Sequence, residues 1–209
     1  MVKLTKRPLP PIKSRRDFDK PDVFDILAED CHGKCYICED KPTSIDVEHI
    51  VPHKSDPALE FDGDNLFIAC RHCNKVKHTK YDDILNPTQC DPEKHISLTF
   101  TADIKNQVYV EALLTDNSTL QTVELLNKVY NDESTSRRKL ECTNFRNEHI
   151  APILYRFELY LHSYRNEPNP DYKELICEEI ARSSIFAAFK RKIVQDDPVL
   201  KEVFASSLA

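Results

Sequence analysis

Four of the eight cysteines form two regularly spaced pairs, Cys35-x2-Cys38 and Cys70-x2-Cys73, with residues 39–69 between them. Two short knuckles of this kind bring four thiolates to the corners of one tetrahedral zinc ion. We therefore predict a structural Zn²⁺ at these four residues. Cys31 and His32 offer an alternative pair of ligands beside the first knuckle. The other four cysteines, Cys31, Cys90, Cys142 and Cys177, have no comparable spacing and are expected by default to be buried free thiols.

The segment around and between the pairs reads Asp46-Val47-Glu48-His49-Ile50-Val51-Pro52, then Gly63-Asp64-Asn65-Leu66, then Cys70-Arg71-His72-Cys73-Asn74-Lys75-Val76-Lys77-His78. The acid–His pair with Ile-x-Pro, the Asn-Leu and the Cys-x2-Cys-Asn-x2-Lys stand in the order of a known family. The segment resembles the HNH endonucleases, in their four-cysteine zinc subclass, over residues 35–80. The resemblance implies a ββα-metal fold and hydrolysis of nucleic-acid phosphodiester bonds, with DNA as the main candidate.

These residue types suit that chemistry on their own terms. Phosphodiester hydrolysis needs a base to activate water and a cation to neutralise charge on the phosphorane. His49 is the expected base, because an imidazole titrates near neutral pH. Glu48 alternates to the other face of an extended segment, and Asn74 and His78 are one helical turn apart. We expect these three residues to hold a catalytic divalent metal, Mg²⁺ or Mn²⁺.

The remaining polar residues of the segment receive supporting roles. The resemblance places Asn65 in the catalytic group, where it keeps the loop in shape and orients the base. Arg71, Lys75 and Lys77 are expected to contact backbone phosphates. His53 and His72 lie near the motif and are expected to be ordinary polar residues.

The amino-acid composition excludes several classes of protein. The chain of 209 residues has two glycines, which excludes a glycine-rich phosphate loop and a dinucleotide fold. Its net charge of −6 hides two basic segments without acids, residues 1–16 and 71–80, whose local fields favour phosphate. No apolar run approaches the roughly 20 residues of a membrane span, and the basic start has no apolar run behind it. We expect a soluble, cytoplasmic protein that does not bind membranes.

The expected fold class is α+β, mainly α: a zinc-stapled ββα-metal core with a β-hairpin and a C-terminal helical region. Residues 1–22, basic and rich in proline, predict an extended arm that is not packed. Residues 23–116 are expected to form the nuclease domain. Its elements would be a helix over 22–30, a strand over 44–51, a helix from about Arg71, and a hairpin of 96–101 and 107–113 with its turn at 103–106.

Residues 117–209 are expected to be helical and to bind a partner. Asn117 or Ser118 would cap the first helix, and a long segment over 134–165 would kink or break at Pro152. After a Pro-Asn-Pro linker, one last helix would carry the apolar residues of 175–189. Residues 185–193 combine a Phe/Ile face with three basic residues, a pattern that can dock in a partner's groove.

Outside the core, a second resemblance involves Ile84-Leu85-Asn86-Pro87, Asp91-Pro92-Glu93 and Thr122-Val123-Glu124-Leu125-Leu126-Asn127. With the basic start, these segments resemble the PtuB-like HNH nucleases of Septu and retron anti-phage systems. The resemblance implies a partner ATPase, PtuA, and the role of nuclease effector in a defence complex. Two other functions stay open: cleavage of structured RNA, and a zinc-knuckle module that binds nucleic acid without cutting. Glu48, His49 and Asn74 favour an enzyme, because a binding module needs no base beside a metal pocket.

Overall fold

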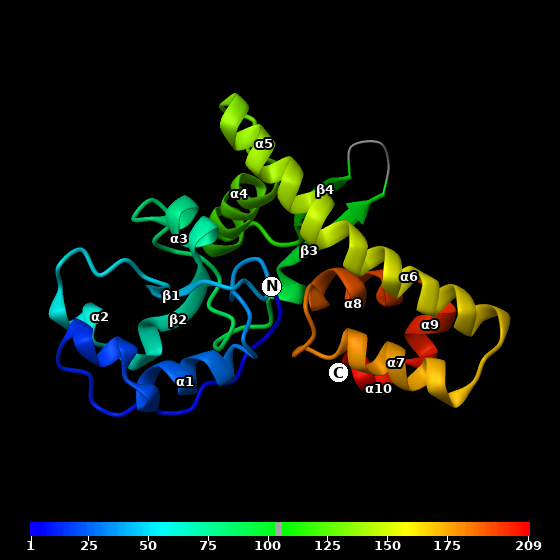
Figure 1. Cartoon of the computed structure of the whole chain (residues 1–209), viewed down its shortest axis with the longest axis horizontal. Helices are drawn as coiled ribbons and strands as arrows, with labels where there is room; N and C mark the ends of the chain where they lie inside the picture. The colour runs from blue at the N-terminus through cyan, green and yellow to red at the C-terminus, as the bar shows by residue number, and fades with distance from the viewer. Residues whose placement is uncertain (103–105) are drawn as a thin grey trace. The chain divides into compact units, whose positions relative to one another are not determined.

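The computed structural model describes residues 1–102 and 106–209, and the chain divides into two compact units (Figure 1). Unit 1 comprises Met1–Ile96 and Ala112–Val129, and unit 2 comprises Ser97–Glu111 and Tyr130–Ala209. The division runs through a hairpin and a helix, and not between residues 116 and 117. Helices predominate, and the described residues hold two antiparallel sheets of two strands each, which confirms the expected fold class.

Unit 1 contains a ββα arrangement between the cysteine pairs and just beyond them. β1 (Ile45–His49) pairs antiparallel with β2 (Leu66–Cys70), with His49 opposite Leu66. β2 is buried along its whole length, as expected for a short, continuously apolar strand. α3 (Arg71–Lys77) follows directly and packs on both strands. The predicted strand over 44–51 and the predicted helix near Arg71 are confirmed.

The other elements of unit 1 are short. They are η1 (Arg15–Asp19), α1 (Pro21–Asp30), α2 (Pro57–Glu60), η2 (Gly63–Asn65) and η3 (Pro92–Lys94). α1 confirms the helix expected over 22–30 and begins at a proline, whose fixed φ suits a first helical turn. α2 is capped by Asp56, whose side chain accepts a hydrogen bond from the Ala58 N–H at 2.9 Å.

The first residues of the chain pack against unit 1. Met1, Val2 and Leu4 are buried. Lys6 Nζ donates to the carbonyl oxygens of Gly63 at 2.5 Å and Leu66 at 2.6 Å, and Arg7 pairs with Asp30 at 2.6 Å. The expectation of an unpacked arm is wrong, because apolar residues between the basic ones cover the core. Two of the basic side chains bind carbonyl and carboxylate oxygens of unit 1 itself.

A hairpin and a long helix connect the two units. β3 (Ile96–Thr101) pairs with β4 (Gln107–Ala112), as predicted, and residues 103–105 of the expected turn lie outside the described residues. α4 (Asn117–Asn131) follows. The Asp116 side chain accepts a hydrogen bond from the Thr119 N–H at 3.0 Å. Asp116 is therefore the cap, and the expected caps, Asn117 and Ser118, lie inside the first turn.

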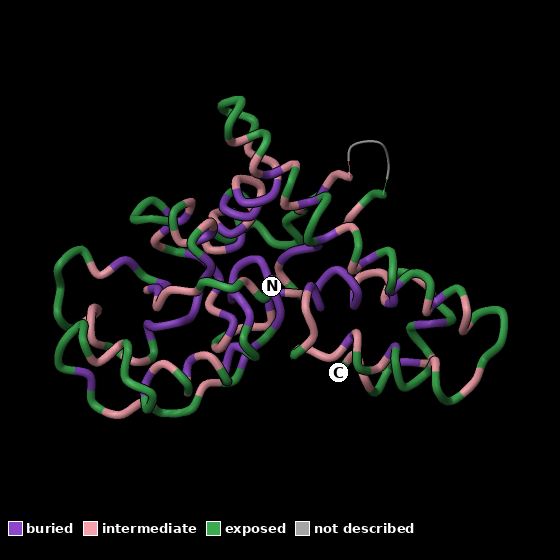
Figure 2. Tube along the Cα trace, viewed as in Figure 1, coloured by how far each residue is buried: buried purple, intermediate pink, exposed green. Residues whose placement is uncertain are grey.

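Unit 2 is helical after the hairpin. Its helices are α5 (Ser136–Asn144), α6 (Ala151–Asn166), α7 (Pro170–Ile180), α8 (Ala187–Asp196), α9 (Pro198–Val203) and α10 (Ala205–Leu208). Buried and exposed stretches alternate along them (Figure 2), and their core comprises Phe157, Leu161, Ile176, Ile180, Val194, Leu200 and Phe204. The break expected at Pro152 is a π-helical turn, Phe145–Ile150. Proline has no N–H for the carbonyl four residues earlier, so a widened turn accommodates its ring.

Residues 185–193 are mostly buried within unit 2, so the predicted docking face is wrong. The single helix expected through 175–189 is also wrong, because α7 ends at Ile180 and the chain turns at Phe186, whose φ is +51°. The Phe186 and Phe189 rings pack against each other at 6.3 Å, and Lys190 is buried in an ion pair with Glu179. An apolar face with basic neighbours is as typical of a helix in a protein core as of a helix that binds a partner protein. Here the residues that contact this face belong to the same chain.

Candidate active site

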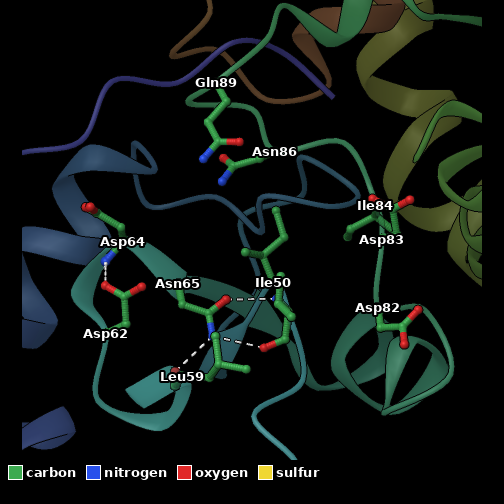
Figure 3. A pocket seen from close by; sticks show the side chains of 11 residues that line it. Ile50, Leu59, Asp62, Asp64, Asn65, Asp82, Asp83, Ile84, Asn86 and Gln89 are labelled. Carbon is green, nitrogen blue, oxygen red and sulfur yellow. Dashed lines mark hydrogen bonds between the residues drawn. The ribbon is translucent and has the colours of Figure 1, made fainter. Parts of the chain in front are cut away.

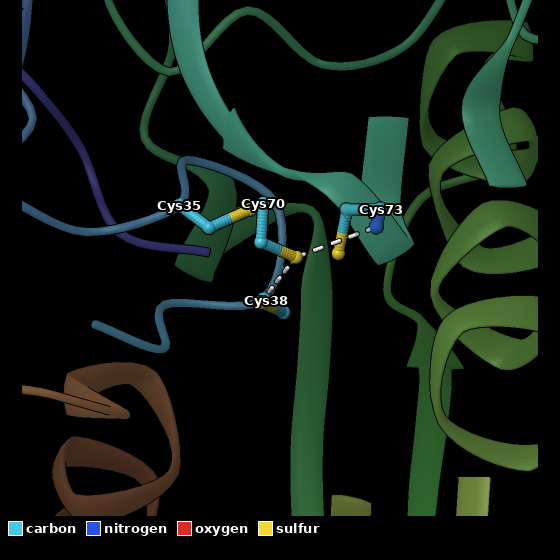
Figure 4. Close-up of side chains that lie close together, drawn as sticks. All are labelled: Cys35, Cys38, Cys70 and Cys73. Carbon is cyan, nitrogen blue, oxygen red and sulfur yellow. Dashed lines mark hydrogen bonds between the residues drawn. The ribbon is translucent and has the colours of Figure 1, made fainter. Parts of the chain in front are cut away.

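Four cysteine side chains meet in unit 1 (Figure 4). Cys35 and Cys38 lie in the turn after α1, Cys70 ends β2, and Cys73 lies in the first turn of α3. All four are buried, and their Sγ atoms lie within 4.8 Å of one another. The Cys73 N–H donates to Cys70 Sγ at 3.4 Å. The predicted set of cysteines is therefore assembled in space.

The spacing of the sulfur atoms fits one tetrahedral metal ion. With metal–sulfur bonds of about 2.3 Å, the edge of such a tetrahedron is about 3.8 Å. Cys38 Sγ and Cys70 Sγ lie 3.9 Å apart. The cluster leaves out the alternative ligands Cys31 and His32. Cys31 is a buried thiol, and burial raises its pKa to about 11, so it stays protonated.

A hollow of about 300 Å³ lies beside β1 and α3. Its lining comprises Glu48, His49, Pro52, His53, Lys54, Ser55, Asn74, His78 and Thr79. The expected base and all three expected ligands of a catalytic metal thus face one space. His53, expected to be an ordinary polar residue, lines the same space. It lies in an irregular loop, so no periodic pattern in the sequence could have identified it as a residue of the site.

His49 is held in one tautomer by the backbone. Its Nε2 lies 2.9 Å from the carbonyl oxygen of Glu60, and a carbonyl oxygen only accepts, so Nε2 carries the proton. Nδ1 therefore keeps a lone pair in the neutral ring. Burial lowers the pKa of His49 below its ordinary value of 6.5, which keeps the ring neutral at physiological pH. A neutral imidazole with an available lone pair is the form that a general base requires.

Asn65 closes the loop that follows β1 (Figure 3). Its Oδ1 accepts a hydrogen bond from the Val51 N–H at 2.8 Å, and its Nδ2 donates to the carbonyl oxygens of Val51 and Leu59, each at 2.9 Å. All three bonds go to backbone. The loop ends at Glu60, whose carbonyl holds His49. Asn65 thus holds backbone groups at both ends of this segment, and its effect on the base His49 stays a prediction.

The three residues expected to bind a catalytic metal come from different local structures. Glu48 is on β1 and Asn74 is in α3, whereas His78 lies just past the end of α3 with a φ of +44°. The expected single helical face for Asn74 and His78 therefore does not extend that far. The carboxylate and the amide oxygen are donors that Mg²⁺ and Mn²⁺ prefer, whereas the imidazole of His78 is a ligand more typical of softer transition metals.

These features coincide with a known kind of domain. Residues 29–80 match the family model described as HNH endonuclease. The chain contains an HNH endonuclease domain. It is also similar to the Septu protein PtuB of Bacillus thuringiensis, with 34% identity over 86 residues, which make up 38% of this chain and 34% of the relative. The chain thus spans about a third of the length of the curated relative it matches.

Lys77 of the HNH domain does not contact solvent, so its predicted contact with phosphate is wrong. Its Nζ donates to Glu48 Oε1 at 2.9 Å and to the His49 carbonyl oxygen at 2.7 Å, and the side chain is fully buried. Tyr36 Oη donates to the other oxygen, Glu48 Oε2, at 2.9 Å. Lys77 lies one turn after Cys73, so both face the β1–β2 sheet. We name the contacts of Tyr36, Glu48 and Lys77 the carboxylate clamp.

The carboxylate clamp opposes the effect of burial on Glu48. Burial raises the pKa of this carboxyl group, and the Lys77 ammonium and the Tyr36 hydroxyl oppose that rise. Each oxygen accepts one of the two bonds, and Glu48 also lines the hollow. The carboxyl group is thus held in place beside the hollow before any cation binds.

Two other basic residues of α3 are exposed. Arg71 lies 3.8 Å from Asp46 with 78% of its side chain exposed, and Lys75 is exposed on the same helix. Both side chains are accessible at the surface of the HNH domain, and their contact with backbone phosphate stays a prediction. A ring nitrogen of His72 lies 3.0 Å from the Val129 carbonyl oxygen, the packing contact expected of an ordinary polar residue. Within residues 1–102 and 106–209, no helix is both long and apolar enough to cross a bilayer.

The carboxylate clamp generates a stability prediction. Lys77→Met leaves the buried Glu48 carboxylate without its cation, so we expect a loss of about 3–5 kcal/mol of unfolding free energy in urea titration. The double variant E48Q/K77M removes the charge as well and should recover much of that loss. Arg71→Met is the matched control, because its exposed pair with Asp46 should contribute at most about 1 kcal/mol. Equal stability of the Lys77→Met and Arg71→Met variants would contradict the clamp.

Proposed function

We propose that the protein is a metal-dependent endonuclease that hydrolyses phosphodiester bonds in nucleic acid. The observation that carries the proposal is the state of His49. The ring is neutral, is held through Nε2 and lines the hollow that Glu48, Asn74 and His78 also line. The HNH family model over residues 29–80 supports the same reaction.

In the proposed reaction, His49 acts as the base. Nδ1 accepts a proton from a water molecule as its oxygen bonds to phosphorus, and the bond from phosphorus to the leaving oxygen breaks. The carbonyl of Glu60 stabilises the resulting imidazolium through Nε2–H. Glu48, Asn74 and His78 would hold Mg²⁺ or Mn²⁺. When bound, such an ion neutralises negative charge on the phosphorane and on the leaving oxygen. Asn65 keeps the loop, and with it the base, in position.

The four-cysteine cluster is proposed to hold Zn²⁺ in a structural role. Four buried thiolates with no open position are the donor set of a closed zinc site. The cluster joins the knuckle after α1, the end of β2 and the start of α3. Folding of unit 1 is therefore expected to depend on the metal.

DNA is the proposed substrate. Arg71 and Lys75 offer exposed cations for backbone phosphates, and such contacts carry most of the affinity for a nucleic-acid duplex. Structured RNA is the second candidate, because phosphodiester chemistry is the same in both polymers. The orientation of His49 disfavours the non-cleaving zinc-knuckle module, since simple binding does not need a neutral imidazole held beside metal donors.

We also propose a setting in anti-phage defence, with a PtuA-like ATPase as the partner. The similarity to the Septu protein PtuB supports this setting. Unit 2 lies entirely outside the HNH match, and we assign partner binding to it. Tyr155 and Leu159 lie one turn apart on α6 and are 67% and 45% exposed. Neighbouring exposed apolar side chains are typical of protein interfaces, and this pair replaces residues 185–193 as the proposed contact.

Metal analysis tests the structural site. Protein purified without chelator should contain one zinc ion per chain, with Zn–S distances of about 2.3 Å by X-ray absorption. Cys73→Ser should lose the ion and the cooperative unfolding of unit 1, because metal binding and folding are linked. Cys90→Ser, outside the cluster, is the control and should keep both. A zinc-free wild type would contradict the assignment.

Replacement of the base tests the activity. His49→Ala should reduce cleavage of plasmid DNA with Mg²⁺ or Mn²⁺ by on the order of 10²–10⁴, with zinc content and thermal midpoint nearly unchanged. His162→Ala, an exposed position on α6, is the matched control. Full activity of His49→Ala would show that another group is the base.

The pH profile of the wild type checks the same assignment. Only the neutral imidazole accepts a proton, so kcat should rise with pH through the pKa of His49. Burial and the facing groups His53 and Lys77 lower this pKa, and the Glu60 carbonyl and carboxylate raise it. Because burial is the largest effect, the midpoint of the acid limb should lie below pH 6.5.

Co-purification tests the partner surface. Tyr155→Glu combined with Leu159→Glu should abolish retention of the PtuA-like ATPase on the tagged protein, while cleavage by the isolated chain stays unchanged. Val199→Glu is the matched control, because Val199 is 69% exposed on α9. Unchanged retention with the double variant would remove α6 from the interface.

A further inference from the structure

His53 is the side chain of the hollow that the proposed reaction leaves without a role. It lines the same hollow as His49, and the centroids of the two rings lie 4.8 Å apart. The His53 side chain is 23% exposed, so it borders both the hollow and solvent. The two imidazoles differ in the hydrogen bonds that they make with the backbone.

The backbone bond of His53 determines which nitrogen can donate. The Ser55 N–H donates to His53 Nδ1 at 3.1 Å. A ring nitrogen that accepts carries no proton, so the proton of the neutral ring is on Nε2. Glu60 Oε2 lies farther from Nδ1, at 3.9 Å, and the other oxygen of this carboxylate, Oε1, accepts a hydrogen bond from Arg15 Nε at 2.5 Å. If the ring were instead doubly protonated, Nε2 would still carry a proton, so Nε2–H is a donor in both forms.

The loop around His53 is built to make that backbone bond. Lys54 and Ser55 have φ values of +49° and +69°, a left-handed conformation that residues other than glycine rarely adopt. The Asp56 N–H donates to the His53 carbonyl at 2.8 Å, and Lys54 pairs with Asp82 at 3.0 Å. Two consecutive unfavourable conformations turn the Ser55 N–H back to the ring. Backbone strain of this kind persists where the surrounding structure imposes it, often at functional sites.

These contacts distinguish two kinds of ligand. A metal ion needs a lone pair, and the Nε2 of His53 has none while Nδ1 accepts from Ser55. An anionic oxygen needs a donor, which Nε2–H supplies. The anion that the proposed function brings beside His49 is the scissile phosphate.

We propose that His53 Nε2–H donates a hydrogen bond to a non-bridging oxygen of the scissile phosphate, which makes His53 a further catalytic residue. The inference rests on the proposed function. Negative charge on these oxygens increases as water adds to phosphorus, so the bond is stronger in the transition state than in the bound substrate. No proton is transferred by His53: it donates a hydrogen bond and keeps its proton throughout.

The test compares His53→Ala with His53→Gln, because the amide N–H of glutamine can replace Nε2–H. His53→Ala should lower kcat by on the order of 100-fold. It should leave the Mg²⁺ or Mn²⁺ concentration for half-maximal activity unchanged. His53→Gln should recover most of the rate, and His162→Ala should behave as wild type. Circular dichroism and zinc content verify that each variant is folded.

A second measurement does not depend on cleavage. Fluorescence anisotropy with a DNA duplex, without added Mg²⁺ or Mn²⁺, should show about 3- to 10-fold weaker binding for His53→Ala and restored binding for His53→Gln. A wild type that cleaves neither DNA nor RNA would end the proposed function. The binding loss and its rescue by glutamine would then still support the phosphate contact.

Three results would overturn the role of His53. Unchanged cleavage and binding in His53→Ala would show that His53 does not contact the phosphate. A raised metal requirement, rescued by excess Mn²⁺, would make it a metal ligand. Failure of glutamine to rescue either the rate or the binding of a folded variant would exclude the role of Nε2–H as donor.

Discussion

Four buried sulfur atoms within 4.8 Å of one another impose the geometry on which the HNH domain depends. A domain core offers no reason to gather four thiols so closely, whereas one cation accounts for all of them. The cluster brings three segments together, and two of these segments supply the partners that hold Glu48 beside the hollow. Tyr36 lies between the first two cysteines, and Lys77 lies one helical turn after the last. Both partners of Glu48 in the carboxylate clamp therefore come from segments of the cysteine cluster.

The clamp matters energetically because of where it lies. Exposed ion pairs such as Arg71–Asp46 contribute about 0–1 kcal/mol, since water screens them and side-chain entropy opposes them. Glu48 and Lys77 are buried, so each would carry an uncompensated charge without the other. Lys77 also binds the carbonyl of His49, so one ammonium group positions the backbone of the base and the carboxylate beside it.

The sequence correctly predicted the features that depend on residues close together along the chain. The Cys-x2-Cys spacing and the strand pattern over 44–51 act over a few residues, and they correctly predicted the cysteine cluster and β1. The ββα arrangement was expected from the resemblance to HNH endonucleases. The errors came from side chains whose partners are distant in sequence. Lys77 reads as a surface cation until its contact with Glu48, 29 residues earlier, is known. The same is true of Lys6 and of Lys190, which lies in the stretch 185–193. Each of these side chains meets its partner only in the folded chain.

The hollow also shows how backbone contacts can give two identical side chains different chemistry. His49 donates its Nε2–H to a carbonyl oxygen and keeps a lone pair on Nδ1. His53 accepts a backbone N–H at Nδ1 and keeps a proton on Nε2. Both neutral rings are the same tautomer, yet the atom left over is an acceptor in His49 and a donor in His53. The sequence alone does not reveal this difference between His49 and His53, because the difference depends on which backbone group faces each ring. In the proposed reaction the first ring takes a proton from water and the second stabilises the charge that this step creates.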